Sequence, residues 1–322
     1  MRSACLRRLL VLLTLLLGST QALAQSCTLA VTGINFSSIN LLSGASYDTT
    51  ATFNISCSNP GLLAATFRIC PNIEAGAGGA SGAIRQMQNA AAQTLNFQLY
   101  QDAARTVTWG SATATQFGTP PTIDVAVNGL SQATTSRTVY ARVLGNQQAT
   151  LGGPYSSVFS GANTRFNYKA YYLLAPALCS TITDNPTQAP FTVQANVDRT
   201  CNVSAQDINF GNRGFLTTAI NATGGLSVTC TLDLPYSISL DGGTSGATSP
   251  TQRKMVRNTA AVIYGLYQNA AHTLPWGTAV GQTVAGTGTG AVQNLPIYGR
   301  VEAQTTPVPG TYTDTVVATV TY

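Results

Sequence analysis

Few side chains in this sequence have the type and spacing that acid–base or nucleophilic chemistry needs. The sole histidine, His272, lies in a polar turn, and the acidic residues are scattered without the pairing that two-carboxylate catalysis requires. The glycine-rich run at residues 76–82 has no lysine after it, so it predicts a flexible loop rather than a phosphate-binding loop. We therefore expect a protein that is not an enzyme, with no catalytic residues and no cofactor.

The first 24 residues have the features of an export signal. A basic start is followed by an apolar run over residues 9–17 and by a small-x-small cleavage pattern at residues 22–24. The apolar run is too short to span a bilayer. We expect residues 1–24 to be removed, and the mature chain to begin at Gln25 in an oxidising compartment.

Six cysteines remain in the expected mature chain, and their even number in an oxidising compartment favours disulfides. Metal binding is the alternative, but the sequence has no Cys-x-x-Cys spacing and one histidine. We therefore predict three disulfides and no metal site. The cysteines are Cys27, Cys57, Cys70, Cys179, Cys201 and Cys230.

Length and composition narrow the class of protein. Charged residues make up 8% of the 322-residue chain, against about 25% in an average soluble protein. The net charge of +5 includes three leader arginines, so the mature chain has 13 basic and 11 acidic residues. No lysine or arginine cluster is present to neutralise phosphates, so nucleic acid is excluded as a partner. The length predicts two domains.

The chain contains two copies of one pattern. Residues 27–57, with Ile-Asn-Phe inside them, recur as residues 201–230, again with Ile-Asn-Phe. Further matches keep the same order: 85–87 with 253–255, 99–101 with 266–268, 109–110 with 276–277, and 139–143 with 297–301. We therefore predict two homologous domains, at residues 25–198 and 199–322.

The duplication also predicts how the cysteines pair. A bridge present in both copies should join equivalent cysteines, and the two cysteines without counterparts are left for each other. In the chain-entropy model each bridge contributes about 3 to 5 kcal/mol, with the most from the longest loop. The predicted bridges are Cys27 with Cys57, Cys201 with Cys230, and Cys70 with Cys179.

Both copies have the pattern of β structure throughout. Short runs rich in Thr, Val, Ile, Phe and Tyr show period-two alternation and are separated by Gly, Asn, Pro and Ser. Many short strands at regular spacing predict an all-β fold of two tandem immunoglobulin-like antiparallel β-sandwiches. The runs are residues 49–57, 96–100, 123–127, 138–143 and 311–322.

The two copies differ at their ends. After residues 165–172 the first copy continues into another alternating segment, whereas the second copy stops at the equivalent run, 311–322. We therefore predict that the second sandwich is incomplete. It lacks its last strand and leaves an acceptor groove that another chain fills by strand addition. The expected groove residues are Val316, Ala318, Val320 and Tyr322.

The alternating segment at the end of the first copy is expected to complete that copy in cis. An interdomain linker is the alternative, but strict alternation over four apolar residues favours a strand. The first domain is then a closed sandwich that is free to bind something. The apolar residues of this donor strand, within residues 189–198, are Phe191, Val193, Ala195 and Val197.

Several motifs together resemble the spore coat U domain family. They are the paired cysteines, Ile-Asn-Phe, Leu-Tyr-Gln, Trp-Gly, and the closing pattern P-x-G-T-Y-x-D-T-V-x-x-T-V-x-Y at residues 307–322. The family includes pilins of archaic chaperone-usher pili, whose incomplete domains accept a donor strand from a periplasmic chaperone and then from the adjacent pilin. The resemblance implies these partners and an outer-membrane usher, with export through the periplasm to the cell surface.

In such pilins the donor strand precedes the first cysteine. Here only Gln25 and Ser26 precede Cys27 in the expected mature chain, so it would accept a strand but not donate one. The resemblance then implies a two-domain tip adhesin of a pilus, which mediates surface attachment and biofilm formation. A secreted structural coat or matrix protein with the same domain is the alternative.

The first copy is longer than the second at three places, and its added residues are apolar for loops. Exposed apolar clusters mark interaction sites, and loops on a rigid scaffold carry function. By resemblance to tip adhesins, we expect these loops to bind an apolar surface or an unknown receptor. The alternative is that they belong to strands and the core. The candidates are Leu62, Leu63, Phe117, Pro120, Leu173, Leu174, Pro176 and Leu178.

Overall fold

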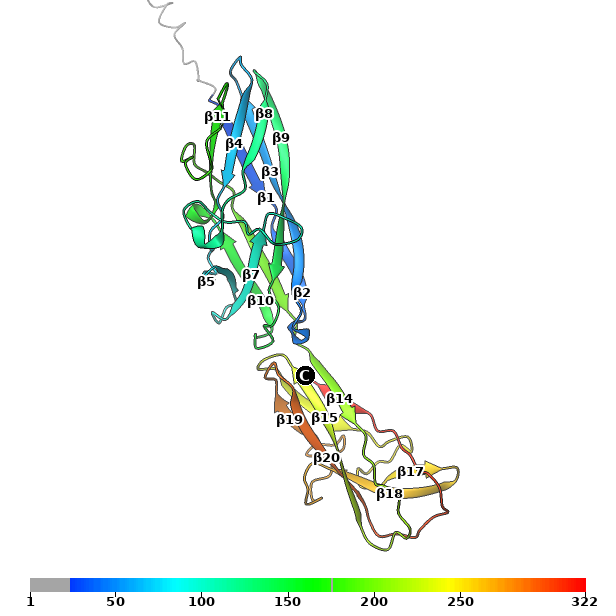
Figure 1. Ribbon diagram of the computed structural model, residues 1–322. Helices are drawn as coiled ribbons and strands as arrows, with labels where there is room; N and C mark the ends of the chain where they lie inside the picture. The colour runs from blue at the N-terminus through cyan, green and yellow to red at the C-terminus, as the bar shows by residue number, and fades with distance from the viewer. Residues whose placement is uncertain (1–23, 175) are drawn as a thin grey trace, which may run out of the picture.

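The computed structural model describes residues 24–174 and 176–322, so the expected leader lies outside the described residues except for Ala24. The described chain forms two β-sandwiches arranged end to end (Figure 1), as the repeated β pattern predicts. Every pairing between the described strands is antiparallel except the one between β13 and β2. Within the described residues, no helix has the length and apolar character needed to cross a membrane.

The described residues of the N-terminal sandwich, called domain 1 below, form thirteen strands and three short 3-10 helices. They are β1 (Ser26–Val31), β2 (Ile34–Ile39), η1 (Leu41–Ser43), β3 (Tyr47–Asn59), β4 (Ala65–Pro71), β5 (Ala80–Ser81), β6 (Ile84–Gln88), β7 (Thr94–Tyr100), η2 (Thr115–Phe117), β8 (Ile123–Val127), β9 (Ser131–Val143), β10 (Gly153–Phe159), η3 (Gly161–Thr164), β11 (Arg165–Tyr171), β12 (Thr187–Gln188) and β13 (Phe191–Val197).

Domain 1 has a long sheet that wraps around its core and a short sheet packed against it. The long sheet runs β1-β3-β9-β7-β6-β10-β13-β2, with β5 on β6, and β2 lies back against β3. The short sheet runs β12-β11-β4-β8. β3 and β9 pair along their full length and form the spine of the domain. β3 suits this place because its inward positions are mostly apolar and its outward positions are Asp, Thr, Asn and Ser.

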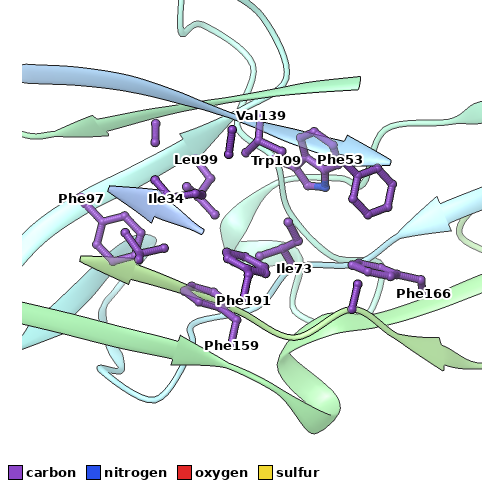
Figure 2. Close-up of a cluster of buried hydrophobic side chains, with 14 of the residues drawn as sticks. Ile34, Phe53, Ile73, Phe97, Leu99, Trp109, Val139, Phe159, Phe166 and Phe191 are labelled. Atoms are coloured by element: carbon purple, nitrogen blue, oxygen red, sulfur yellow. The ribbon is translucent and has the colours of Figure 1, made fainter. Parts of the chain in front are cut away.

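The core of domain 1 is rich in aromatic side chains from both sheets (Figure 2). Phe53 of β3 meets Trp109 and Phe166 edge-to-face, with ring centroids 5.7 and 5.2 Å apart. Phe159 of β10 stacks on Phe191 of β13 at 4.6 Å. Aromatic pairs of this kind add about 0.5 to 1.5 kcal/mol each beyond the burial of their area. The stacked pair therefore ties β13 to the core.

The C-terminal sandwich, called domain 2 below, repeats this plan with fewer strands. A sheet ordered β14-β15-β20-β18-β17 faces a short sheet ordered β19-β16-β21, and the two enclose a separate core. The strands are β14 (Cys201–Gln206), β15 (Ile220–Cys230), β16 (Pro235–Leu240), β17 (Arg253–Arg257), β18 (Ala260–Tyr267), β19 (Val284–Thr287), β20 (Gln293–Val301) and β21 (Ala318–Thr321).

Three disulfides fasten the described chain, and they join the cysteines that the duplication pairs. Cys27 lies directly opposite Cys57 on β1 and β3, and the equivalent bridge of domain 2 links β14 to β15 in the same way. The bridge between Cys70 and Cys179 spans 109 residues and attaches the loop after β11 to β4. The first two bridges therefore clamp one edge strand of each sandwich, and the third fixes a loop.

Each domain encloses one arginine whose guanidinium group is fully buried. Arg85 donates to the carbonyl oxygens of Ile73 and Trp109 at 2.6 and 2.8 Å. Arg253 repeats the bond to the tryptophan carbonyl, at 2.9 Å from Trp276. Burial lowers the pKa of Arg85 to about 9, so the group is still charged at neutral pH. The guanidinium groups thereby supply donors to buried carbonyl oxygens, including those of the two tryptophans.

Replacing Arg85 with methionine should destabilise domain 1 strongly. Methionine keeps a long apolar side chain but leaves buried carbonyl oxygens without donors, and hydrogen bonds to a charged group are worth about 1.5 to 3 kcal/mol each. We expect the free energy of unfolding of domain 1 to fall by at least about 3 kcal/mol. The measurement is chemical denaturation followed by Trp109 fluorescence in a Trp276→Phe background.

The matched control is Arg142→Met, which removes only a surface ion pair with Asp48. Exposed pairs contribute about 0 to 1 kcal/mol, so this variant should unfold almost as the parent does. Equal losses in the two variants would contradict the role given to Arg85.

Candidate functional site

In domain 1 the wall of the sandwich is closed by β13. This strand runs antiparallel to β10, from Phe191 opposite Phe159 to Val197 opposite Gly153, and parallel to β2 on its other side. The segment is therefore a strand inserted between β10 and β2, and not a linker. Its buried inward side chains are Phe191, Val193, Ala195 and Val197.

Domain 2 contains the counterpart of β10 at residues 310–316. Thr313 bridges to β17, just as Ser156 of β10 pairs with β6. The preceding tyrosines match as well, because the hydroxyl of Tyr155 donates to the carbonyl four residues earlier and that of Tyr312 does the same. The two segments can therefore be compared position by position.

The place that β13 fills in domain 1 is empty among the described residues of domain 2. Residues 310–316 form one side of it, and the Ile-Asn-Phe segment at 208–210, the counterpart of the start of β2, forms the other. Core side chains that are buried in domain 1 are only partly buried here. We call this surface the open edge. The pairs are Ile34 with Ile208, Phe36 with Phe210, Tyr155 with Tyr312, and Phe159 with Val316.

The backbone at the open edge is unpaired on one side. Thr313 and Val256 exchange both of their hydrogen bonds, at 2.9 and 3.4 Å. The backbone groups of Tyr312 and Asp314 point the other way, as neighbours in a strand do, and they have no backbone partner among the described residues. A sheet edge with free N–H and C=O groups beside partly exposed apolar side chains can accept an added strand.

The groove expected from the sequence lies farther along the chain than the open edge. β21 pairs with β16 through Ala318 and Val320, so these residues already belong to the short sheet, and Tyr322 is 57% exposed. The chain passes from one sheet to the other just after Val316, as domain 1 does between β10 and β11. The alternation of apolar and polar residues continues through this crossing, so the sequence pattern does not reveal it. The corrected residues are Ile208, Phe210, Tyr312, Asp314 and Val316.

One charged side chain, Asp314, lies among the apolar residues of the open edge. Its carboxylate accepts hydrogen bonds from the Tyr264 hydroxyl at 2.7 Å and from the backbone N–H groups of Thr244 and Thr315 at 2.8 Å. Burial, together with the hydrogen bond to Asp314, raises the pKa of Tyr264, so the phenol stays protonated. Sequence reasoning missed this residue because its counterpart in domain 1 is a serine.

A second candidate surface lies at the end of domain 1 that points away from domain 2 (Figure 1). The β3–β4 loop, the β8–β9 loop and the start of the loop after β11 meet at this end. All three carry apolar side chains that are at least 49% exposed. We call these residues the apolar tip: Leu62, Leu63, Leu130, Tyr172, Leu173 and Leu174. Leu130 was not expected, although the Asn-Gly pair before it marks a turn.

Hydrogen bonds fix the loops of the apolar tip to one another. The side-chain amide of the fully buried Asn59 donates to the carbonyl of Leu63 at 2.8 Å, inside the β3–β4 loop. The N–H of Leu130 donates to the carbonyl of Gly61 at 2.8 Å, which joins the β8–β9 loop to the β3–β4 loop. Loops that are already ordered lose little entropy when they bind, so exposed leucines on them are suited to contact with another surface.

The loop after β11 turns back from the tip along the outer face of the short sheet. Besides the disulfide at Cys179, Arg68 of β4 holds this loop by donating to the carbonyl of Pro176 at 3.0 Å. Leu178 is 72% exposed but lies next to Cys179, on the side of the domain. Pro176 is partly buried. Of the candidates in this loop, only Leu173 and Leu174 lie at the tip.

Two expected adhesive residues are buried, and their assignment was wrong. Phe117 in η2 is 3% exposed, and its ring lies 4.7 Å from the guanidinium carbon of Arg85. Pro120 is buried as well. The added segment folds back over a buried cation, which an aromatic ring shields favourably from water. Its apolar residues therefore serve the core of domain 1.

The described residues offer little for catalysis or metal binding elsewhere. His272 packs edge-on against Tyr267 and Tyr298, and burial lowers its pKa. In the part of the chain that the structure describes, no three His, Cys, Asp or Glu side chains are grouped to hold a metal ion. The two candidate sites formed by the described residues are the open edge and the apolar tip.

Known proteins match both halves of the chain. A family model described as Spore Coat Protein U domain matches residues 13–161 and 187–319. Protein U of Myxococcus xanthus is 31% identical over 164 residues, which cover 46% of this chain and 89% of that protein.

Among solved structures, a similar chain occurs in the CsuC–CsuE chaperone–tip adhesion subunit pre-assembly complex from archaic chaperone-usher Csu pili of Acinetobacter baumannii. The identity is 16% and the TM-score 0.53, over 92% of this chain and 100% of that chain. At this level of identity the likeness shows a shared fold.

Hydrogen exchange should distinguish the open edge from its closed counterpart. Among the described residues, no neighbouring strand covers the amides of residues 312–316 as β13 covers those of β10, so these amides open without breaking a ladder. We expect this segment to exchange at least about 100-fold faster than Tyr155–Phe159, measured by mass spectrometry on the full chain. β20 and β9, which have partners on both sides, serve as matched controls and should both stay protected. Equal protection of the two test segments would show that the edge is not open.

Proposed function

The chain belongs to the Spore Coat Protein U domain family, and from this premise we propose that it is the tip adhesin of a pilus assembled by donor-strand complementation. The observation that carries the proposal is the contrast between two copies of one domain. β13 closes domain 1, and the same place in domain 2 is open. A chain with one closed and one open domain is joined to its fibre through the open one.

The partner at the open edge is a β-strand with alternating apolar side chains. In domain 1 the strand in this place buries four such side chains, and an incoming strand would cover Ile208, Phe210 and Val316 in domain 2. A periplasmic chaperone would supply the first strand, and at the outer-membrane usher the adjacent pilin would replace it. The similar fold from Acinetobacter baumannii, found in a complex of a chaperone with a tip adhesion subunit, supports partners of this kind.

The apolar tip is the surface that attaches the fibre. In domain 2 the equivalent pole faces domain 1, since Leu232 in the β15–β16 loop forms a bridge with Leu151 at the base of domain 1. In domain 1 the same pole is free and carries exposed leucines. Contact of this apolar cluster with an apolar surface or receptor would mediate attachment and biofilm formation. The three disulfides fit export through the periplasm to the cell surface.

A secreted structural coat or matrix protein is the second candidate function. The family description as a spore coat protein and the 31% identity with Protein U favour it. Such a protein would also need a strand at its open edge, but its assembly would not depend on the apolar tip. Variants of the tip therefore separate the two candidates.

A strand supplied in cis should complete domain 2. The test appends to Tyr322 a flexible linker as long as residues 173–190, followed by an alternating apolar strand, because domain 1 reaches from β11 to β13 in this way. The full chain should become monomeric on size-exclusion chromatography. The thermal midpoint of domain 2 should rise by about 10 °C or more, since several apolar side chains become buried.

The control fusion carries aspartate at the inward positions of the added strand and should give no gain in the thermal midpoint. If the unfused chain is already a stable monomer, and the apolar strand leaves its midpoint unchanged, then domain 2 does not lack a strand.

Polar substitutions in the apolar tip should weaken attachment without unfolding domain 1. In the strand-completed chain, the triple variant Leu62→Ser, Leu173→Ser and Leu174→Ser loses apolar contact worth about 1 to 2 kcal/mol per side chain. Binding to polystyrene should fall at least about 10-fold, and the midpoint should change by less than about 2 °C. Val158→Ser, at a 46% exposed apolar residue of β10, is the control and should bind as the parent does.

Two other outcomes of the tip experiment are informative. Unchanged binding by the triple variant would assign adhesion elsewhere and favour the coat or matrix function. A lower midpoint would mean that the three leucines support the fold instead of a contact surface.

A further inference from the structure

β10 and its counterpart in domain 2 each have three successive inward side chains. The middle side chain is neutral in domain 1 and carries a carboxylate in domain 2. In domain 1 the three are Tyr155, Ser157 and Phe159, all buried under β13. In domain 2 they are Tyr312, Asp314 and Val316, all partly buried. An incoming strand must therefore cover a carboxylate in domain 2 where β13 covers a serine hydroxyl in domain 1.

The carboxylate of Asp314 is fixed at the open edge by its neighbours. It accepts three hydrogen bonds, from the Tyr264 hydroxyl and from two backbone N–H groups, at 2.7 to 2.8 Å. A Cβ atom added to Gly243 would come within 2.1 Å of a carboxylate oxygen, so that glycine makes room for the charge. Ser157 has a simpler environment, in which its hydroxyl accepts one bond from the N–H of Gly78 at 3.0 Å.

The surrounding side chains change together with this residue. Arg85 of domain 1 lies opposite Phe97, and Arg253 of domain 2 lies opposite Tyr264, whose hydroxyl reaches Asp314. Burial lowers the pKa of Arg253, and the charge of Asp314 is among those that oppose this effect. The carboxylate thus belongs to a polar network built into domain 2.

The register of β13 shows which residue of an added strand would lie over the carboxylate. Val193 is directly opposite Ser157, with both side chains on the inward face. Directly opposite residues have Cβ atoms about 4.5 to 5.5 Å apart. In the same register on domain 2, a valine would exclude water from Asp314 and offer no hydrogen bond in return, which is unfavourable.

The carboxylate has capacity for one more donor. A carboxylate group has about four acceptor positions, and three hydrogen bonds reach Asp314 from within the domain. A hydroxyl or amide N–H on the incoming strand could occupy the remaining position. Hydrogen bonds to a charged acceptor are roughly twice as strong as neutral ones, so one such contact can decide between two strands.

We propose that Asp314 selects the strand that domain 2 accepts: a strand with apolar inward residues except for one hydroxyl or amide side chain opposite Asp314. This inference rests on the donor-strand function proposed above and adds the chemistry of the partner. A strand with the sequence of β13 would place the residue equivalent to Val193 opposite Asp314, so it should bind domain 2 poorly. We call this place in the added strand the central position. Asp314 thereby disfavours joining of copies of this chain through their own β13 strands.

Four fusions of the full chain test this selection. After Tyr322 and the linker, each carries either the sequence of β13 (FTVQANV) or the same strand with serine at the central position (FTSQANV), with or without Asp314→Ser. The readout is the thermal midpoint of domain 2, followed by Trp276 fluorescence in a Trp109→Phe background. With Asp314 present, the serine strand should give the higher midpoint by about 4 °C or more. With Asp314→Ser, the valine strand should be the better one.

The outcomes separate selection by Asp314 from the donor-strand function. Selection by Asp314 is overturned if both strands raise the midpoint in the presence of Asp314 but the serine strand gives no higher midpoint than the valine strand. The donor-strand function would then still stand. If no strand raises the midpoint in any background, the donor-strand function fails and this inference fails with it. Asp314→Asn is the second variant, for the case in which Asp314→Ser disturbs the fold. It keeps the shape of the side chain and removes its charge, so it should reduce the preference for the serine strand.

Discussion

A strand in a sheet has backbone donors and acceptors on both edges, and each edge must meet another strand, solvent or a second chain. In domain 1, β13 meets this need for β10 and β2 at once, because it lies between them. The burial of Tyr155 and Phe159 follows from that insertion. In domain 2, where no described strand is inserted, the equivalent side chains are only partly buried and their backbone groups have no backbone partners among the described residues.

The two copies share the features that hold the sandwich together and differ at the two candidate sites, the open edge and the apolar tip. Both have the disulfide between the first two strands of their sheet, a buried arginine bonded to a tryptophan carbonyl, and the same tyrosine bond before the open or closed edge. They differ in the final strand and in the loops of the apolar tip. The loops of the apolar tip can change without repacking the core, whereas the final strand adds four buried side chains to the core of domain 1.

Internal repetition made much of the fold predictable, because each copy served as a reference for the other. The cysteine pairs and the closing segment at Phe191–Val197 came from equivalent positions and strict alternation. The open edge was displaced in the prediction, since the step between sheets after Val316 does not interrupt the alternation. Phe117 was misplaced because its burial depends on Arg85, a contact distant in sequence. Asp314 gave no signal, since its hydrogen-bond partners are up to 70 residues away.

Under the proposed function, the positions of the open edge and the apolar tip would let one chain assemble and attach independently. The apolar tip lies at one pole of domain 1, and the open edge belongs to the separate core of domain 2. Because β13 already completes domain 1, a strand added to domain 2 changes no contact in the core that supports the tip loops. Sequence changes at the apolar tip therefore leave the open edge intact, and changes in a strand added to domain 2 leave the apolar tip intact. The open edge and the apolar tip are independent of each other because β13 completes domain 1 in cis.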